Sequence, residues 1–507
     1  MRALALAASL LAAATFARAG TATLLAYGDD GKALSAADLL AKISRADRRG
    51  RPALWGWSPD GVGSARPTIS QRGDAVVLSW DGPRKLVLSL PWPIADDGFS
   101  TVLIDRDGRG ISSGDTIRMS EEIALTQYRL FRDSLIKHEK DMEPRLEASA
   151  KLKKLAEKAK DSIADAETKT DDAKRARAFT DALHDISVAS ETMLVEHGRQ
   201  IAADPRGRAA LRFGLTLDAT LLERLDQYKW IVDEVQRSGA NWVRLVFRPN
   251  PSDFRYEEQR SFNEYDNIIK YIRSKGIHIM GCPLSTDQWP AELTPPVYAE
   301  RVKRIVLHYR GQIDSWEVGN EVNGDWLGGR RSPLPPDDVV RIFAAGASAV
   351  KDIDPSFETV LTLFWWEGAA PDDVHSLRGW LQHYARRAFT KDIDVVALSL
   401  QVDDNPVGLS FERMFDRVRD AFPDKRLMLG NLGYVEGDQL TGYWWLDPKD
   451  VDGARKDLLT WLTPGACGVD HSLGGGFWWQ TLDQLLPSSK RATDVYRVYR
   501  QSVHRLR

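Results

Sequence analysis

Tryptophans, carboxylates and amides recur from residue 244 onward, at the points where short apolar runs end. The flat face of a Trp side chain stacks on the C–H face of a sugar ring, and carboxylates and amides bind hydroxyl groups with two hydrogen bonds at a time. The chain holds 17 Trp, against 16 Phe and 13 Tyr, so such faces are plentiful. If one rim of the fold collects these side chains, that rim is suited to a carbohydrate. The residues concerned are Arg244, Trp289, Asn320, Glu321, Trp326, Trp366, Gln401, Asp403, Asp404, Asn431, Tyr434, Trp478 and Trp479.

Eight apolar runs alternate with amphipathic stretches from Leu211 to the end of the chain. Strands that alternate with helices form a parallel sheet, and eight repeats predict an α/β fold, a closed (β/α)8 TIM barrel, over residues 209–507. The competing fold is an open doubly wound sheet, which normally has a Gly-rich phosphate loop after its first strand, whereas FGLTLDATLLER has none. Ligands of a (β/α)8 barrel bind at the C-terminal ends of its strands. The runs are LRFGLT, NWVRLVF, GIHIMGCPL, QIDSWEVGNE, TVLTLFWW, IDVVALSLQ, RLMLGN and GGFWWQT.

Two further regions precede the predicted barrel. Residues 20–115 contain short strand-like runs between turn residues, such as DAVVLSW and KLVLSLPW, and predict a small β-rich accessory domain. Residues 116–208 are dense in helix formers with charges of alternating sign, which predicts a hairpin of two long helices that breaks between Thr168 and Asp172. Such a hairpin either packs on the barrel or mediates self-association.

The first 19 residues have the pattern of a secretory signal peptide. Arg2 precedes an apolar run from Ala3 to Phe16, and Ala17-Arg18-Ala19 matches an A-x-A cleavage site. We therefore expect cleavage after Ala19 and a secreted or periplasmic protein. No later segment reaches the roughly 18 apolar residues that a membrane span needs.

Composition narrows the expected partners and cofactors. A net charge of −3 gives no reason to expect nucleic acid. The aromatic, carboxylate and amide side chains at the strand ends make polysaccharide or oligosaccharide the expected partner. The nine His show no H-x-H or H-E-x-x-H spacing, so no metal is expected, and no other cofactor is expected either. No G-x-S-x-G elbow of a Ser-His-Asp hydrolase is present. Cys282 and Cys467 either form one disulfide or stay as two separate thiols.

Three segments of the predicted barrel resemble the clan A glycoside hydrolases, a superfamily with a (β/α)8 fold. WEVGNEVNG, residues 316–324, resembles the strand-four signature, in which the acid/base Glu follows an Asn. GANWVRL, residues 239–245, is similar to the strand-two segment, and GFWWQT matches the habit of ending strand eight with a Trp. The resemblance covers about residues 209–507 and neither of the preceding regions.

The resemblance implies a role for several residues. Glu321 would be the general acid/base, and Asn320 would bond the sugar hydroxyl beside the anomeric carbon. Arg244 would support the base of the cleft, and Trp478 would form its floor. Glu317 lies four residues before Glu321 and within the strand, so we expect it to be internal to the barrel rather than catalytic.

The sequence departs from the superfamily at the end of strand seven. Retaining members have a nucleophilic Glu there, about 5 Å from the acid/base, in the pattern Glu, one residue, Gly, then commonly an aromatic. This chain has Asn431-Leu432-Gly433-Tyr434. A neutral amide is too weak a nucleophile to form the usual glycosyl-enzyme intermediate.

Three interpretations stay open. The favoured one is a hydrolase that takes a different second carboxylate, from Asp403, Asp404, Glu367 or Glu436. The second is a catalytically inactive barrel that binds polysaccharide. The third is a substrate-assisted hydrolase of acetamido sugars, in which Asn431 orients the acetamido group.

Overall fold

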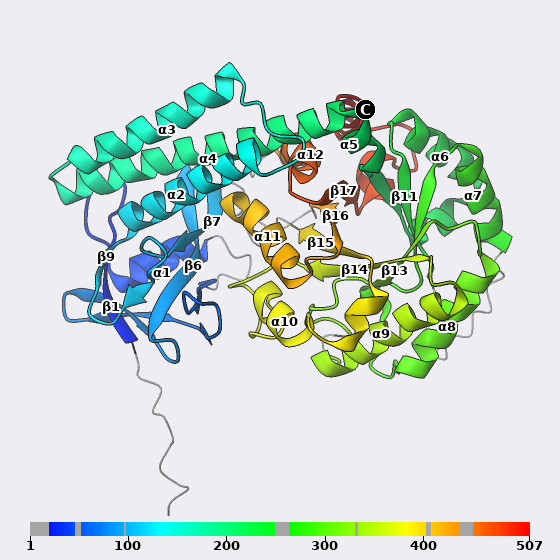
Figure 1. The fold of residues 1–507 in the computed structure, drawn as a ribbon, viewed down its shortest axis with the longest axis horizontal. Helices are drawn as coiled ribbons and strands as arrows, with labels where there is room; N and C mark the ends of the chain where they lie inside the picture. The colour runs from blue at the N-terminus through cyan, green and yellow to red at the C-terminus, as the bar shows by residue number, and fades with distance from the viewer. Residues whose placement is uncertain are drawn as a thin grey trace, which may run out of the picture.

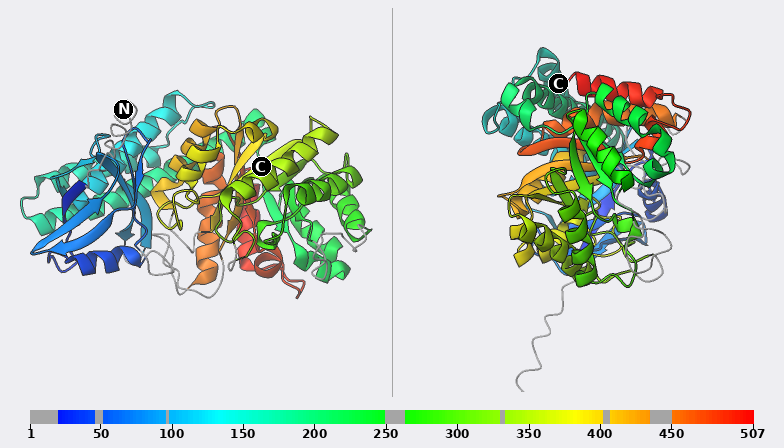
Figure 2. Two further views of the ribbon diagram at one scale, coloured as in Figure 1. Left: turned by 90° about the horizontal axis from the view of Figure 1, so that it is seen from below. Right: turned by 90° about the vertical axis from the view of Figure 1, so that its right-hand side faces the viewer.

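The chain has two structural parts that lie against each other, a β-rich part under long helices and a barrel (Figures 1 and 2). Here and below the structure is a computed structural model. Among the residues that it describes, no helix is long and apolar enough to cross a membrane. The described residues are 20–45, 52–95, 98–248, 263–329, 333–401, 407–434 and 450–507.

The β-rich part consists of two sheets, in agreement with the prediction of a β-rich region before the barrel. One sheet has the order β4-β5-β1-β9, and the other has the order β3-β2-β6-β7, with β8 paired to β6. Strand β1 alternates between buried and partly exposed residues, as a strand with one core face should. Helix α1 (Ala36–Ser44) begins at Ser35, whose side chain accepts a hydrogen bond from the Asp38 N–H. The strands are β1 (Gly20–Leu25), β2 (Trp55–Trp57), β3 (Ser64–Ala65), β4 (Thr68–Arg72), β5 (Ala75–Trp80), β6 (Lys85–Ala95), β7 (Gly98–Ile104), β8 (Ile111–Ser112) and β9 (Thr116–Arg118).

The helical region contains three long helices where the sequence predicts two. The break between Thr168 and Asp172 is present, but a further break follows Lys140, and Pro144 lies in that loop. The second break has a local cause, because Pro lacks the N–H that a continuing helix would need. Helix α4 packs against both α2 and α3, and Figure 1 shows the three running together over the β-rich part. The helices are α2 (Met119–Lys140), α3 (Ala150–Thr168), α4 (Asp172–Ala203) and the short α5 (Pro205–Ala210).

Eight parallel strands close into a barrel in the order of the sequence, β10 to β17. Closure is made by β10 and β17, where Leu215 pairs with Trp478. The predicted (β/α)8 barrel is thereby confirmed, and the open doubly wound sheet is excluded. Because both faces of each strand are covered, the strands are almost continuously buried. They are β10 (Gly214–Leu217), β11 (Trp242–Val246), β12 (His278–Cys282), β13 (Ser315–Gly319), β14 (Glu358–Phe364), β15 (Val395–Gln401), β16 (Arg426–Gly433) and β17 (Ser472–Trp478).

Helices surround the barrel and carry the chain from one strand to the next. Helices α8 and α9 each have Pro in their first turn, where the missing N–H costs nothing. Short 3₁₀ or π turns, η1 (Ala219–Gln227), η2 (Thr286–Gln288), η3 (Ala388–Asp392), η4 (Gly408–Ser410) and η5 (Thr481–Leu485), lie in the connections. The helices are α6 (Tyr228–Arg237), α7 (Asn263–Ser274), α8 (Pro295–His308), α9 (Pro336–Ile353), α10 (Leu377–Tyr384), α11 (Phe411–Ala421), α12 (Val451–Cys467) and α13 (Asp494–His504).

The long helix α4 lies directly on α12 of the barrel. A Cβ added to Gly198 of α4 would be 1.9 Å from the carbonyl oxygen of Pro464 in α12. Only a residue without a side chain permits this approach. The helical region is therefore packed onto the barrel, which was one of its two predicted roles.

A chain of buried polar side chains joins the same two parts. The Nδ1 atoms of His138 in α2 and His197 in α4 are 2.6 Å apart, and both side chains are fully buried. His138 Nε2 lies 2.9 Å from a carboxyl oxygen of Glu412 in α11, and His197 Nε2 lies 2.7 Å from the carbonyl oxygen of Pro144. Burial lowers the pKa of His197 to about 4, and the Glu412 pKa is lowered to about 2 because His138 and Lys137 outweigh its burial.

The thiols and the surface complete the description of the fold. Both cysteines are free and buried, Cys282 in β12 and Cys467 at the end of α12, so the alternative of one disulfide between them does not hold.

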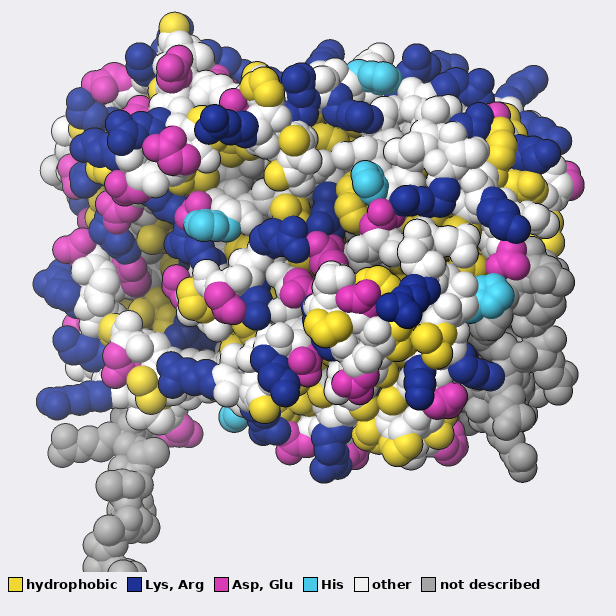
Figure 3. Space-filling model, turned by 45° about the vertical axis from the view of Figure 1, so that its right-hand side comes forward, with side chains coloured by type: hydrophobic (Ala, Val, Ile, Leu, Met, Phe, Trp, Pro, Cys, Tyr) yellow, Lys and Arg dark blue, Asp and Glu magenta, His cyan; other side chains and the backbone are white. Residues whose placement is uncertain are grey.

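On the face shown in Figure 3, acidic and basic side chains are interspersed, with hydrophobic side chains between them. This face therefore carries no broad field of one sign, as a net charge of −3 would suggest.

Candidate active site at the C-terminal ends of the barrel strands

Glu321 lies just beyond the C-terminal end of β13 and has an uncommon backbone conformation. Its φ is +51°, in the left-handed region that residues with a side chain rarely adopt. The turn is held on both sides, because the Val322 N–H donates to the Thr362 carbonyl oxygen at 3.2 Å and the Gly324 N–H donates to the Glu321 carbonyl oxygen at 2.9 Å. Strained backbone that the surroundings enforce is frequent at functional sites. Here it fixes the direction in which the Glu321 side chain leaves the chain.

The carboxyl group of Glu321 is held by side chains from two other strands. Ser399 of β15 donates a hydrogen bond to it through Oγ, and the side chain of Asn431 of β16 forms a second hydrogen bond. Burial raises the pKa of Glu321 to about 7, and the negative charge of Glu317 acts in the same direction. The hydrogen bonds from Ser399 and Asn431 and the positive charge of Arg244 oppose this rise. The result is a carboxyl group that holds and releases a proton near neutral pH.

An ion pair lies buried inside the barrel beside Glu321. Arg244 Nε donates to Glu317 at 2.7 Å, and both side chains are almost wholly shielded from solvent. The other Glu317 oxygen accepts a hydrogen bond from Thr362 Oγ1 at 2.6 Å and a longer one from Asn320 Nδ2 at 3.5 Å. Both oxygens of Glu317 are therefore occupied. Glu317 is internal to the barrel, and its evident task is to hold Arg244 in place.

Several polar atoms that face into this end of the barrel have no hydrogen-bond partner within the described residues. Thr216 of β10 pairs in register with Arg244 of β11, so both side chains leave the sheet on the same face. Gln401 follows Ser399 by two positions in β15 and shares its face. Buried polar atoms are normally paired, so a cluster of unpaired ones at a strand-end site suggests that a ligand completes them. The atoms are Thr216 Oγ1, Arg244 Nη1, Gln401 Oε1 and Asn431 Oδ1.

The tryptophans of the predicted site differ in their surroundings. Trp479 is partly exposed, and the Arg244 guanidinium carbon lies 5.0 Å from the centre of its ring. Trp478 is fully buried, and its Nε1 donates to Gln484 at 3.0 Å. The side chain that lies against Arg244 is therefore that of Trp479, whereas Trp478 was expected to form the floor.

Four more aromatic residues of the predicted site lie on other loops. Trp289 and Trp366 are buried, and their indole N–H groups donate to backbone carbonyl oxygens at 3.2 and 2.7 Å. Trp326 is partly exposed and contacts Trp366, with ring centres 5.6 Å apart. Tyr434 is buried just after β16. Of these four, Trp326 is the one that keeps an accessible face for a ligand.

The candidates for a second carboxylate are placed only in part. Asp403, Asp404 and Glu436 lie outside the described residues. Glu367 is buried where the β-rich part meets the barrel, forms an ion pair with Arg417 and accepts a hydrogen bond from Ser89 at 3.0 Å. That carboxylate is engaged elsewhere, so it is not the partner of Glu321. Within the described ranges, no group of three or more His, Cys, Asp or Glu side chains is suited to holding a metal ion.

Sequence reasoning did not single out Ser399 or Thr362, the two hydroxyl groups that bond Glu321 and Glu317. Each is a small polar residue inside a strongly apolar strand, Ser399 in VVALSLQ and Thr362 in ETVLTLF. A hydroxyl residue in a strand buried on both faces needs a partner inside the protein. That signal is present in the sequence and would have drawn attention to both.

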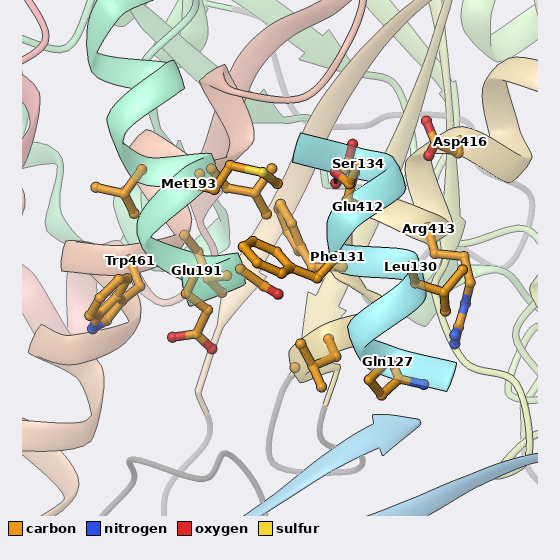
Figure 4. Close-up of a pocket in the computed structure, with 18 residues that line it drawn as sticks. Gln127, Leu130, Phe131, Ser134, Glu191, Met193, Glu412, Arg413, Asp416 and Trp461 are labelled. Carbon is orange, nitrogen blue, oxygen red and sulfur yellow. Dashed lines mark hydrogen bonds between the residues drawn. The ribbon is translucent and has the colours of Figure 1, made fainter. Parts of the chain in front are cut away.

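A separate cavity of about 140 Å³ lies between the helical region and the outer helices of the barrel (Figure 4). Its walls come from α2, α4, η4, α11 and α12 and not from the strand ends. Phe131, Met193 and Trp461 give it apolar walls, and Glu191 and Glu412 add carboxylates. This cavity is thus distinct from the site around Glu321.

Comparison with known proteins gives a likeness of fold only. No family model matches the chain, and no curated protein matches it. Among solved structures, a GH10 endoxylanase from a sugarcane soil metagenome is 14% identical with a TM-score of 0.43, and covers 57% of this chain and 96% of its own. Xylanase 10B from Thermotoga petrophila RKU-1 is 12% identical with a TM-score of 0.43, covering 61% and 97%. The GH53 catalytic domain of Ignisphaera aggregans is 16% identical with a TM-score of 0.39, covering 53% and 87%.

Because these TM-scores are below 0.5, the fold is assigned from the strand order of the protein itself. By that order and by its site, the protein is a (β/α)8 barrel with a carboxyl group of near-neutral pKa at the C-terminal ends of its strands.

Proposed function

We propose that this protein is an exported glycoside hydrolase that cleaves a glycosidic bond of a polysaccharide or oligosaccharide, with Glu321 as its general acid/base. The observation that carries the proposal is the setting of Glu321, a partly buried carboxyl group whose pKa is raised to about 7 and whose position three strands fix. A glycosidic bond breaks when a proton reaches the leaving oxygen. A group with a pKa close to the working pH supplies that proton and can take it back.

The surroundings of Glu321 suit a sugar. Polar atoms of Thr216, Arg244, Gln401 and Asn431 that have no partner among the described residues offer donors and acceptors to hydroxyl groups. The partly exposed ring of Trp479, held beside Arg244, supplies a face for the C–H bonds of a pyranose. We assign to Trp479 the role of floor. Arg244 is the residue that supports it, and Glu317 positions Arg244.

The second candidate function is binding without cleavage. Asn431 lies near the end of β16, where the superfamily that the sequence resembles has its nucleophilic carboxylate, and Glu367 is engaged with Arg417. Both observations favour a barrel that retains a sugar site and has lost a catalytic group. In that case Glu321 would serve as a hydrogen-bonding group for the ligand.

The discriminating experiment is an assay of reducing ends released from a panel of polysaccharides. Wild type is compared with Glu321→Gln, which keeps the shape of the side chain and removes its proton, and with Asn431→Glu. Release by wild type that Glu321→Gln abolishes supports the hydrolase. Release by Glu321→Gln at the wild-type rate would refute the role of Glu321, and activity found in Asn431→Glu alone would establish the binding barrel.

The export that we propose has its own test. The protein is expressed in a Gram-negative host, and the mass of the mature chain is measured in periplasmic and culture fractions. A chain that begins at Gly20 supports cleavage after Ala19. An uncleaved chain in the cytoplasm would contradict it.

A further inference from the structure

The side-chain amide of Asn431 has one engaged end and one end without a partner in the described part of the chain. Its hydrogen bond with Glu321 lowers the pKa of that carboxyl group, so Asn431 is the donor and its Nδ2 end faces Glu321. Oδ1 is then the free end, and no described residue donates to it. Asn431 is 1% exposed, so this oxygen has lost water without gaining a donor from any residue that the structure describes. A donor on a bound ligand would restore the missing hydrogen bond.

The position of this oxygen limits which donor it meets. Asn431 lies at the end of β16 and contacts the carboxyl group that we assign as the acid. In the proposed reaction its Oδ1 therefore lies close to the anomeric carbon and to the substituent on the neighbouring C2. A C2 substituent with an N–H donor is an acetamido group. Because a trans amide points its C=O and N–H in opposite directions, fixing the N–H at Asn431 turns the carbonyl oxygen back toward the anomeric carbon.

We propose that the sugar on the non-reducing side of the cleaved bond carries a 2-acetamido group, and that its carbonyl oxygen attacks the anomeric carbon in place of a protein carboxylate. The inference rests on the proposed function, since Glu321 must still protonate the leaving oxygen. It accounts for a neutral amide at the nucleophile position, because a substrate that brings its own nucleophile needs only to be oriented there.

The reaction balances with water as the single co-reactant. In the first step the carbonyl oxygen forms a bond to the anomeric carbon, the bond to the leaving oxygen breaks, and the Glu321 proton passes to that oxygen. The product is an oxazolinium ring, whose N–H stays hydrogen-bonded to Asn431 Oδ1. In the second step water attacks the anomeric carbon, Glu321 takes the proton of that water, and the ring opens to restore the acetamido group. The configuration at the anomeric carbon is retained.

The charges of the site agree with a cationic intermediate. When Glu321 has given up its proton, its negative charge lies beside the positive ring. Arg244 would oppose a cation, but Glu317 neutralises it at 2.7 Å. A 2-hydroxyl group could also donate to Asn431 Oδ1, yet it supplies no nucleophile. The two kinds of substrate therefore differ in rate and not only in binding.

The test compares aryl 1,2-trans glycosides and short oligosaccharides that carry N-acetyl, N-fluoroacetyl or N-trifluoroacetyl groups with their 2-hydroxy counterparts. Fluorine withdraws electrons from the carbonyl oxygen, so we expect kcat/KM to fall along the series, by about 100-fold for the trifluoroacetyl compound, which is about 2.7 kcal/mol. Equal rates along the series would overturn the inference. Cleavage of 2-hydroxy glycosides that depends on Glu321 would also overturn it while leaving the proposed function intact, and no cleavage of any substrate would end both.

Variants of Asn431 add a readout that does not depend on turnover. Asn431→Leu removes both the acceptor and the donor to Glu321 at similar volume, whereas Asn431→Asp removes the donor and keeps the acceptor, so the comparison of the two isolates Oδ1. We expect Asn431→Leu to lower kcat on the N-acetyl substrate by about 100-fold or more, with a smaller change in KM, and Asn431→Asp to retain most of it. A thiazoline analogue of the ring, measured by calorimetry, should bind wild type and Asn431→Asp and bind Asn431→Leu at least about 10-fold more weakly. Equal binding to a folded Asn431→Leu would refute the role of Oδ1.

Discussion

Replacing Ser399 by Ala should raise the pKa of Glu321 further. Ser399 Oγ of β15 donates to the Glu321 carboxyl group, and this hydrogen bond favours the ionised form of Glu321. A hydrogen bond to a charged group contributes about 1.5–3 kcal/mol, and 1.36 kcal/mol corresponds to about one pH unit. The titration midpoint of Glu321 should therefore move upward by about one to two pH units in Ser399→Ala.

Two assays measure this change. The side-chain carbons of Glu321 in isotopically labelled protein titrate in an NMR spectrum with or without a substrate. If the protein is a hydrolase, the basic limb of its kcat/KM profile reports the same group in the free enzyme. Since the acid works in its protonated form, that limb should move to higher pH in Ser399→Ala.

The matched control is Ser410→Ala, which removes another fully buried serine hydroxyl from the barrel. Ser410 Oγ donates to the Val407 carbonyl oxygen at 2.7 Å and has no contact with Glu321. The control should leave the midpoint of Glu321 where it is in wild type. An unchanged or lowered midpoint in Ser399→Ala, or an equal rise in Ser410→Ala, would refute the assignment of Ser399 as the group that holds Glu321 ionised.

Three further predictions concern the ligand face and the junction of the two parts. Trp479→Ala should weaken carbohydrate binding by about 10-fold through loss of the stacking face. Affinity electrophoresis measures this binding, and an unchanged affinity would argue against the role of Trp479. Acid should destabilise the protein, because the His197 pKa of about 4 lies below its unfolded value of about 6.5. This contribution is complete above pH 6.5 and is lost as the pH falls toward 4, at most about 3 kcal/mol. Chemical denaturation of wild type and His197→Gln across that range checks this, and an equal loss in both would contradict it. Gly198→Val should separate α4 from α12, because its Cβ would overlap the Pro464 oxygen; a drop of several degrees in Tm is expected, and an unchanged Tm would count against this contact.

The barrel was predictable because its signal is repeated. Eight apolar runs of similar length, each followed by a helical stretch, leave few arrangements that bury every strand. The same repetition indicates where each strand ends, so Glu321 and Asn431 could be assigned to one rim although 110 positions separate them. The structure has Asn431 in hydrogen-bonding contact with Glu321.

Two features of the site could not be predicted from the sequence. One depends on the exact register of a strand end, and the other on contacts between residues far apart in the chain. Trp478 ends β17 and Trp479 follows it directly, so a shift of one residue exchanges their roles. Only the structure shows that Trp479 lies against Arg244. Glu367 follows β14 as a catalytic carboxylate might, and its engagement by Ser89 joins positions 278 residues apart. No local pattern contains that information.

At the junction of α2 and α4, the partners of the two histidines determine which ring nitrogens carry hydrogens. His197 Nε2 must carry a hydrogen, because it faces the Pro144 carbonyl oxygen, which only accepts. Neutral His197 then accepts at Nδ1, so the hydrogen between the rings belongs to His138. His138 Nε2 and Glu412 share one more proton across 2.9 Å.

This arrangement of hydrogen bonds cannot accept an additional proton. Protonating His197 at Nδ1 would set two N–H groups against each other over 2.6 Å. The hydrogen bonds of the junction are thus compatible with a single arrangement of protons. Acid destabilises that arrangement where α2 and α4 of the helical region meet α11. Since local openings follow the weakest contacts, the helical region should open as a unit of its own while the barrel remains closed. Hydrogen exchange at mildly acidic pH would then show α2 and α4 losing protection before β10 to β17.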